Sequence, residues 1–436
     1  MLTAGLAKVC ITPSVGVPLA GFAARQGNAS GVHDDLYVRA CVIEQGGRAL
    51  AFVTVDLLAL DAQFVCDVRR AVQRRTGIAP EATLVAATHT HAGPVTIQTF
   101  FNPGASLDAA YMQRLAAAIE QCVSQAWQSS QPARIGVGTG RAEGVGVNRR
   151  SPDQRPIDDQ IALLRVDDEQ GRTRGVVINY ACHPTVLGPD NLLVTGDFPA
   201  YTIDEVEAAL GAGSVAMFVN GTQGNISVGH SSELSAIGII TPGRTFERAS
   251  EIGTALGRAV LEALPNVATT SQTVLNCCST STELPLKSYP GASQTAAALD
   301  AAKRRLDDLV STDAPDEAVA RARTERLYAS ITKFFAAEAR KRSNGHLPIE
   351  LQGFRVGDAA FVAIPAELFV EIGLRIKREA LHRTFICGVT NGYIGYLPDG
   401  PAYAAGGYEV VASMCAEGAD AALVRATHAV VERLFA

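Results

Sequence analysis

The 436-residue sequence carries little charge and no concentrated block of it. Charged residues make up 19% of the chain, the formal net charge is −6, and no basic run or stripe is present. Because nucleic-acid binding requires such a basic footprint, the sequence argues against a nucleic-acid partner. Internal repeats and low-complexity linkers are also absent. Hydrophobic residues reach 47%, which is typical of a globular protein with a large core.

Signals for export and for crossing a membrane are missing as well. The sequence from Met1 reaches a lysine at Lys8 before any long apolar segment forms. No stretch approaches the roughly 20 apolar residues of a membrane-spanning helix. The nine cysteines are scattered without any C-x-x-C spacing, which favours reduced thiols. We therefore expect a cytoplasmic protein with no stable membrane anchor.

Short apolar runs alternate with amphipathic segments along most of the chain. Their periodicity predicts strands at 51–55, 176–180, 215–219, 359–364 and 385–389, and helices at 61–75 and 111–128. This alternation predicts an α/β fold, with mixed β-sheets flanked by α-helices.

One segment, about 292–342, is instead rich in alanine, arginine and glutamate with a helical period. A break at 311–315 predicts a helical hairpin, with Asp313 or a neighbour capping the second helix. We interpret the hairpin as a solvated excursion packed on the core of a single domain spanning 1–436. The alternatives are a lid over a site or a contact between copies in a homo-oligomer.

A histidine pair follows the apolar run 84–87, in the sequence THTHAGP at 88–94. Residues two apart in an extended strand share a face, so His89 and His91 are expected to project together. The Ala-Gly-Pro that follows cannot continue the strand, which places both imidazoles at its end. Two converging imidazoles are a natural start for a Zn²⁺ site, but zinc needs a third and usually a fourth ligand.

Three later segments offer those ligands. His183 ends the apolar strand of NYACHPT (179–185) at a proline turn. Glu367, in IPAELF (364–369), is expected to open a helix, where a negative charge is favoured. Tyr393 and Tyr396 lie on the glycine-rich loop that follows the last predicted strand, and a cation can lower the pKa of a nearby phenol.

A glycine-rich turn, QGNIS at 223–227, follows the predicted strand at 215–219. Such a turn can present the hydroxyl of Ser227 and free backbone N–H groups, as an acyl-transfer site requires. It lacks the G-x-S-x-G pattern of a nucleophile elbow, so the turn alone is a weak signal.

Taken together, these segments resemble the catalytic domain of the neutral (non-lysosomal) ceramidases, zinc-dependent amidases that hydrolyse the N-acyl bond of ceramide. The resemblance extends in the same order along nearly the whole chain. It is carried by the segments GLAKVCITPSVGVPLAGFAAR (5–25), GVHDDLYVRA (31–40), THTHAGP (88–94), NRRSP (148–152), NYACHPTVLGPDNLLVTGD (179–197), QGNIS (223–227), IPAELF (364–369) and TNGYIGY (390–396).

The resemblance implies a zinc site and assigns its ligands by position. They fall on His89, His183, Glu367 and Tyr393, with Tyr396 as the alternative to Tyr393. Beyond the ligands, His91 matches the family's second active-site histidine, which we expect to relay a proton to the leaving amine.

Two further features match the family's substrate site, and one position departs from it. Ser227 matches a serine beside the zinc, which acts either as a nucleophile or as an orienting group. Arg149 or Arg150 matches an arginine that contacts the substrate. The family usually has Asp where this chain has Asn225.

The resemblance also bears on the substrate. Ceramidases of this family carry a secretion signal and a C-terminal immunoglobulin-like domain, and neither is seen in this sequence, which ends at Ala436. We therefore predict a zinc-dependent amidohydrolase acting on a soluble small-molecule amide. The first alternative is a true ceramidase that cleaves a lipid amide. The second is a non-catalytic, metal-stabilised binding protein.

Overall fold

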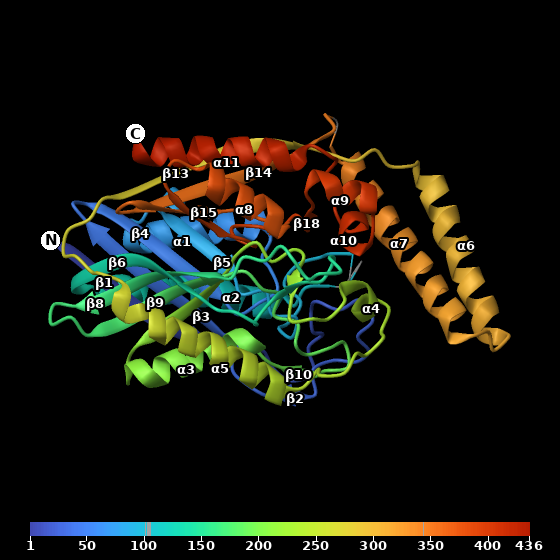
Figure 1. Ribbon diagram of the computed structural model, residues 1–436, viewed down its shortest axis with the longest axis horizontal. Coiled ribbons are helices and arrows are strands. Elements are labelled where there is room, and N and C mark those ends of the chain that lie inside the picture. Colours follow the sequence, from blue (N-terminus) through green and yellow to red (C-terminus); the bar gives the residue numbers. More distant parts are fainter. Residues whose placement is uncertain (101, 103–105, 343) are drawn as a thin grey trace.

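An eight-stranded sheet forms the centre of the computed structural model, which describes residues 1–100, 102, 106–342 and 344–436 (Figure 1). Its strands lie in the order β11 (Val215–Asn220), β9 (Thr173–Tyr180), β8 (Gln160–Asp168), β6 (Gln131–Arg141), β1 (Leu2–Cys10), β3 (Tyr37–Gln45), β4 (Arg48–Val55) and β5 (Thr83–Ala87). Neighbouring strands are antiparallel except at the two edges, where β4 pairs with β5 and β9 with β11 in parallel. The predicted strands at 51–55, 176–180 and 215–219 all lie in this sheet.

A second sheet of four strands packs on the first. Its order is β13 (Leu275–Pro285), β14 (His346–Val356), β15 (Ala359–Ala363) and β17 (Arg383–Cys387). Aromatic side chains join the two sheets, because Phe52 on β4 lies with its ring centroid 5.1 Å from that of Phe354 and 5.5 Å from that of Phe361. These fully buried rings fill the core between the sheets.

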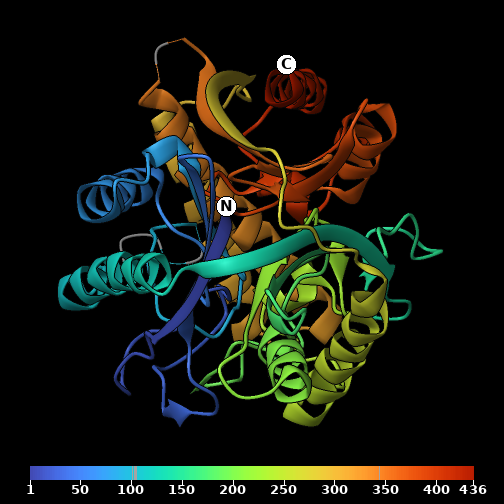
Figure 2. The same cartoon turned by 90° about the vertical axis from the view of Figure 1, so that its left-hand side faces the viewer.

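Most of the longer helices cover the outer faces of the two sheets, and the other helices lie beyond the ends of the strands (Figure 1). They are α1 (Ala62–Thr76), α2 (Ala109–Gln128), α3 (Phe198–Leu210), α4 (Ser232–Ala236), α5 (Phe246–Ala263), α6 (Ala292–Ser311), α7 (Asp316–Arg340), α8 (Val370–Glu379), α9 (Gly400–Ala405), α10 (Tyr408–Val411) and α11 (Ala419–Phe435). In Figure 2, α1 and α2 (blue and teal) lie together at one side and α11 (red) lies over the smaller sheet. The predicted α/β class is confirmed. No helix in the described part of the chain has the length and apolar character needed to cross a membrane.

The predicted helical hairpin is present as α6 and α7, which extend away from the sheets in Figure 1. The inner face of α7 buries Ile331 and Phe335 against the core. The expected cap by Asp313 or a neighbour is wrong. The N-cap of α7 is Pro315, whose ring offers no hydrogen-bonding group, and Asp313 instead has a left-handed φ of 51° within the turn.

Three β–α–β units carry the segments that the sequence marks as functional. They are β4–α1–β5, β9–α3–β11 and β15–α8–β17, and each pairs its two strands in parallel. The chain leaving β17 lies beside the other two units, since Thr390 forms a bridge with Ala86 on β5 and Gly388 donates to the carbonyl of Asn220 at 2.8 Å. The carboxyl ends of three parallel pairs therefore meet at one place, where functional groups gather in α/β proteins.

Three short two-stranded sheets also belong to the fold, and they include segments that follow these strand ends. They are β2 (Gly31–Val32) with β10 (Leu193–Val194), β7 (Val147–Asn148) with β12 (Ile226–Ser227), and β16 (Glu367–Leu368) with β18 (Tyr396–Leu397).

Candidate functional site

Three buried histidines meet at the shared strand ends. His89 follows β5, His91 follows two residues later, and His183 follows β9. One ring nitrogen from each lies within 4.8 Å of those of the other two, which is close enough for a metal ion to bridge them. The structure therefore brings together both of the histidine segments found in the sequence.

The histidine pair converges for a different reason from the one predicted. Strand β5 ends at Ala87, and His89 has a left-handed φ of 72°, so the pair does not lie on an extended strand. The backbone of His89 is held by a hydrogen bond from its N–H to Leu57 O (2.9 Å), and its Nδ1 lies 2.8 Å from Leu58 O. These contacts turn Nε2 of His89 toward His183 and Glu367, whose nearest carboxylate oxygen, Oε2, lies 3.4 Å away.

His183 is oriented by the same kind of contact. Its Nδ1 lies 2.6 Å from Gln223 O, which assigns the ring proton to Nδ1 because a carbonyl only accepts. Its Nε2 then presents a lone pair to Oε2 of Glu367, 2.7 Å away. Burial, followed by the nearby Arg149, lowers the pKa of His183 to about 4, so the ring is neutral at neutral pH.

Glu367 does not open a helix, contrary to the expectation from sequence. It lies on β16, which is only two residues long and pairs with β18, and helix α8 begins at Val370. This position directs a fully buried carboxylate at the histidines. Burial raises the pKa of Glu367, and the larger lowering to well below the usual value comes from positive charge at His89 and His183, a role that a metal ion bound at their Nε2 atoms would take. The carboxyl group is therefore ionised.

These donors fit a metal ion. When the protons of His89 and His183 are on Nδ1, two Nε2 lone pairs and an ionised carboxylate face one another in a buried space. Such acceptors repel one another unless a cation is bound there. Nε2 of His89 has no hydrogen-bond partner in the described residues, as expected for a metal ligand. Backbone carbonyls that fix the other ring nitrogen are typical of metal-binding histidines.

The two candidate tyrosines have different partners. The hydroxyl of Tyr393 hydrogen-bonds to Oε1 of Glu367, beside the histidine and carboxylate cluster. The hydroxyl of Tyr396 instead accepts a hydrogen bond from Nη2 of Arg149 at 3.1 Å. The geometry therefore brings Tyr393 to the possible metal ligands and Tyr396 to the arginine. Burial, and then the charge of Glu367, raises the pKa of both phenols well above 10.

His91 differs from the other two histidines, because neither of its ring nitrogens has a partner in the described part of the chain. Its ring lies against Phe22, with centroids 5.0 Å apart, and against the backbone of Gly21. A Cβ on Gly21 would come within 2.5 Å of His91 Cγ, so only glycine fits there. Burial, followed by the neighbouring His89 and His183, lowers the pKa of His91 well below 6.5. The result is a neutral imidazole that no hydrogen bond restrains.

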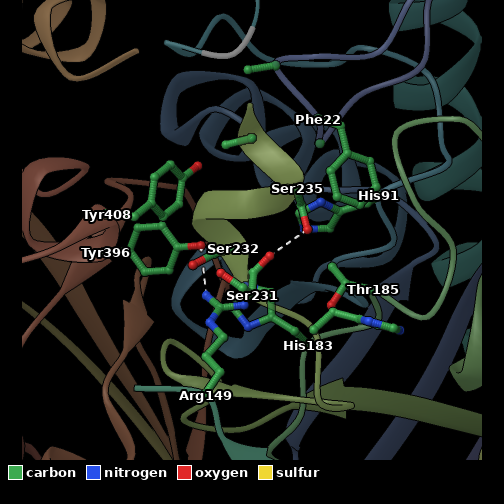
Figure 3. Close-up of a pocket in the computed structure, with 14 residues that line it drawn as sticks. Phe22, His91, Arg149, His183, Thr185, Ser231, Ser232, Ser235, Tyr396 and Tyr408 are labelled. Atoms are coloured by element: carbon green, nitrogen blue, oxygen red, sulfur yellow. Dashed lines mark hydrogen bonds between the residues drawn. The ribbon is translucent and has the colours of Figure 1, made fainter. Parts of the chain in front are cut away.

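The two adjacent arginines, Arg149 and Arg150, have different surroundings. Arg149 lines a pocket together with His91, His183 and Tyr396, as Figure 3 shows, whereas Arg150 is absent from the described lining. Both arginines bind the buried carboxylate of Glu409, from Arg149 Nε at 2.9 Å and from Arg150 Nη1 at 2.8 Å. A further hydrogen bond joins Arg149 Nη2 to Gly224 O at 2.8 Å. Arg149 is therefore fixed with its guanidinium at the pocket.

Ser227 lies close to this pocket but outside its described lining. It belongs to β12, is fully buried, and donates its hydroxyl to His230 O at 3.0 Å. The neighbouring Asn225 accepts from Val370 N and donates to Glu371 Oε2, both at 2.8 Å. An aspartate at position 225 could accept but could not donate to Glu371. The asparagine is therefore matched to the start of α8 in this chain.

Several residues of the pocket were not identified from the sequence. They are Phe22, Thr185, His230, Ser232, Tyr408 and the supporting Glu409. Phe22 and Thr185 lie inside segments that resemble the family, and His230 lies three residues beyond another such segment. A search of these segments and of the residues just after them could have found all three. Tyr408 and Glu409 carry no local signal.

The fold and the cluster together define an α/β protein with a buried histidine and carboxylate centre able to hold a metal ion. Residues 3–233 match the family model described as neutral/alkaline non-lysosomal ceramidase, N-terminal. This match covers just over half of the chain, and the chain belongs to that family. The resemblance found in the sequence is thus confirmed.

Individual relatives agree with the family assignment. A neutral ceramidase from Pseudomonas aeruginosa is 27% identical over 243 residues, which cover 51% of this chain and 36% of the relative. A neutral ceramidase from Mycobacterium tuberculosis is 26% identical over 266 residues, covering 53% of this chain and 41% of that protein. The crystal structure of the Pseudomonas aeruginosa neutral ceramidase has the same fold, with a TM-score of 0.76 at 21% identity over 99% of this chain and 75% of that one. The sequence matches thus span well under half the length of these curated relatives.

Proposed function

We propose that this protein hydrolyses the amide bond of a lipid amide of the N-acylsphingosine (ceramide) type, with a metal ion held by His89, His183, Glu367 and Tyr393. The observation that carries the proposal is the convergence of two Nε2 lone pairs on the ionised Glu367, within a fold shared with neutral ceramidases. The comparisons support the lipid amide more strongly than the soluble amide predicted first from the sequence.

The shape of the site supports a lipid amide as well. The pocket beside the histidines is narrow, with a cavity volume of about 20 Å³. A neighbouring cavity of about 280 Å³ shares the wall formed by Gly21, Phe22 and Ala23. Apolar side chains, including Leu58 and Ile97, line this second cavity and could cover a hydrocarbon chain.

A Zn²⁺ ion bound at these ligands would polarise the scissile carbonyl and activate a water molecule. The remaining chemistry falls to residues of the pocket. His91 is neutral and has both ring nitrogens available, so it can accept a proton from the attacking water and deliver it to the leaving amine. The amide C–N bond breaks, and a fatty acid and an amine are released.

Arg149 is suited to bind the oxygen on which negative charge develops. The described contacts occupy its Nε and Nη2 and leave Nη1 available to a substrate oxygen. We assign Ser227 an orienting role, because its hydroxyl is committed to His230 O. An acyl-enzyme at Ser227, sought by mass spectrometry after rapid acid quenching, should therefore be absent.

The test is an assay of purified protein on N-acylsphingosine in detergent micelles and on short soluble amides, together with elemental analysis for zinc. The proposal expects about one zinc per chain and turnover of the lipid amide. Turnover of soluble amides alone would favour the first prediction from the sequence. A metal-free protein whose melting temperature does not change with a chelator, and which cleaves neither class of amide, would contradict the proposal.

A further inference from the structure

Two polar groups in the wall of the pocket have no role in the chemistry above and no partner among the residues that the structure describes. Among the described residues that line the pocket, the unpartnered buried side-chain atoms are those of His91 together with Thr185 Oγ1 and His230 Nε2. Thr185 is 6% exposed and His230 7%. A buried polar atom without a partner destabilises the folded protein, so two such atoms in one pocket point to a ligand that pairs with them.

The hydrogen bond at Nδ1 of His230 determines whether Nε2 of the same ring is a donor or an acceptor. Nδ1 of His230 lies 2.8 Å from Thr241 Oγ1, and that oxygen already accepts a hydrogen bond from Arg244 Nε at 3.3 Å. The hydroxyl proton of Thr241 can then go to Nδ1, which leaves the imidazole proton on Nε2. Burial, followed by the charges of Arg244 and Arg248, lowers the pKa of His230 to about 4. The ring is neutral, and its Nε2–H is a buried donor without a partner in the described residues.

A single buried arginine holds both groups in place. Arg244 Nη1 donates to the carbonyls of Thr185 at 3.3 Å and Leu187 at 3.1 Å, and Nη2 donates to the hydroxyl of Ser235 on α4. With the bond from its Nε to Thr241, Arg244 thus joins the segment after His183 to the partner of His230. Arg244 therefore acts on this wall by holding its segments in place.

We propose that His230 and Thr185 form a subsite for a hydroxyl group on the amine half of the substrate, separate from the scissile carbonyl. A hydroxyl can accept from Nε2–H of His230 and donate to Oγ1 of Thr185, whereas a carbonyl or ether can only accept. This inference rests on the proposed amide hydrolysis, since N-acylsphingosine carries hydroxyls on its amine half. It assigns substrate specificity to a pocket wall distinct from the candidate metal ligands.

The test uses two substitutions that each keep one half of the imidazole. His230→Gln places an amide donor near the position of Nε2, and His230→Asn keeps only a group near Nδ1. The matched control is His33→Asn, because His33 also bonds a hydroxyl, that of Tyr201 at 2.7 Å, but is exposed and outside the described lining of the pocket. Thermal melting verifies that each variant is folded.

The substrates are N-acylsphingosine and its analogues that lack one or the other hydroxyl. His230→Asn should lower kcat/KM for the parent about 10-fold or more, and His230→Gln should lower it less than His230→Asn does. His33→Asn should stay within about 3-fold of the original protein. One hydroxyl-deficient analogue should be cleaved equally by the original protein and by His230→Asn. If His230→Asn discriminates among the three substrates as the original protein does, the subsite is wrong.

A second readout does not depend on turnover. In protein labelled with ¹⁵N-histidine and loaded with zinc, the Nε2 resonance of His230, identified by its loss in His230→Gln, should show the protonated Nε2 and should shift when a short-chain N-acyl amino alcohol is added. A shift without cleavage of any amide would retain the subsite and contradict the proposed reaction. Cleavage without a shift would retain the reaction and contradict the subsite.

Discussion

Nε2 of His183 lies 2.7 Å from Oε2 of Glu367, while Nδ1 of the same ring faces the carbonyl of Gln223 at 2.6 Å. Together these two contacts turn an imidazole lone pair toward a carboxylate in the core of the protein. A metal ion held by these two groups would remove the repulsion between them.

The glycine beside His91 gives a prediction with a closely matched control. Gly21 and Gly16 both have a φ of 98°, but a Cβ at Gly21 would lie 2.5 Å from His91, whereas a Cβ at Gly16 would have no atom within 4 Å. Gly21→Ala should lower kcat/KM about 10-fold or more, because it displaces His91 by about 1 Å. Gly16→Ala should lower only the stability, because its backbone is strained in the same way but no side chain is displaced. The zinc content of both variants should be unchanged. Equal kinetics for the two variants would show that the position of His91 does not matter.

The two neighbouring arginines give a second matched pair. Arg149 lines the pocket and Arg150 does not belong to the described lining, although both bind Glu409. Arg149→Ala should lower kcat/KM about 100-fold, as expected for a lost oxyanion donor, and Arg150→Ala should lower it no more than about 3-fold. In both variants the remaining arginine still pairs with Glu409, so stability should change to a similar extent. A larger loss of activity for Arg150→Ala would reverse the assignment.

The turn before Ser227 predicts an effect on stability. Asn225 is 1% exposed and donates to Glu371, which also accepts a hydrogen bond from Asn148 at 3.2 Å. Asn225→Asp would replace that hydrogen bond by two facing carboxylates, and should lower the free energy of unfolding by about 1–3 kcal/mol at pH 8. Adding Glu371→Gln should restore most of the loss, because the new amide can donate to the aspartate. Additive losses in urea unfolding would rule out this direct contact.

The pH dependence of stability provides a third kind of test. The pKa of His230 is about 4 in the folded protein, below the value of about 6.5 in an unfolded chain. The unfolded state therefore binds more protons between these values, so His230 should favour folding fully above pH 6.5 and progressively less as the pH falls toward 4. Urea unfolding of the metal-free protein across this window should show a smaller decline for His230→Asn than for the original chain. Identical declines would mean that His230 is not buried as a neutral ring.

Much of the fold follows from local patterns in the sequence. The strands at 51–55, 176–180 and 215–219 are apolar because they are buried in the core. The hairpin at 292–342 has a helical period that can be recognised without knowing what the helices pack against. Both histidine segments were found because strand ends in α/β proteins collect polar groups.

The finer geometry of the site depends on contacts between distant segments, which no local pattern encodes. The strand that holds Glu367 exists only because of its pairing with Tyr396 and Leu397, so a helix start was predicted there instead. The difference between Arg149 and Arg150 depends on Glu409, about 260 residues away in sequence. His89 also has a left-handed backbone set by Leu57 and Leu58 rather than by the strand before it.

The three histidines alone are also close enough to hold a metal ion, so two different ligand sets are possible at this centre. We propose that His91 is not a ligand, because no carbonyl in the described residues orients its ring, whereas Leu58 and Gln223 orient His89 and His183.

The most direct test is the zinc content, by elemental analysis, of His89→Ala and His91→Ala purified side by side. His89→Ala should lose about one equivalent of zinc. His91→Ala should retain the zinc and lose about 100-fold or more in kcat, the effect of a missing proton relay. Loss of zinc from His91→Ala together with its retention in His89→Ala would contradict the account.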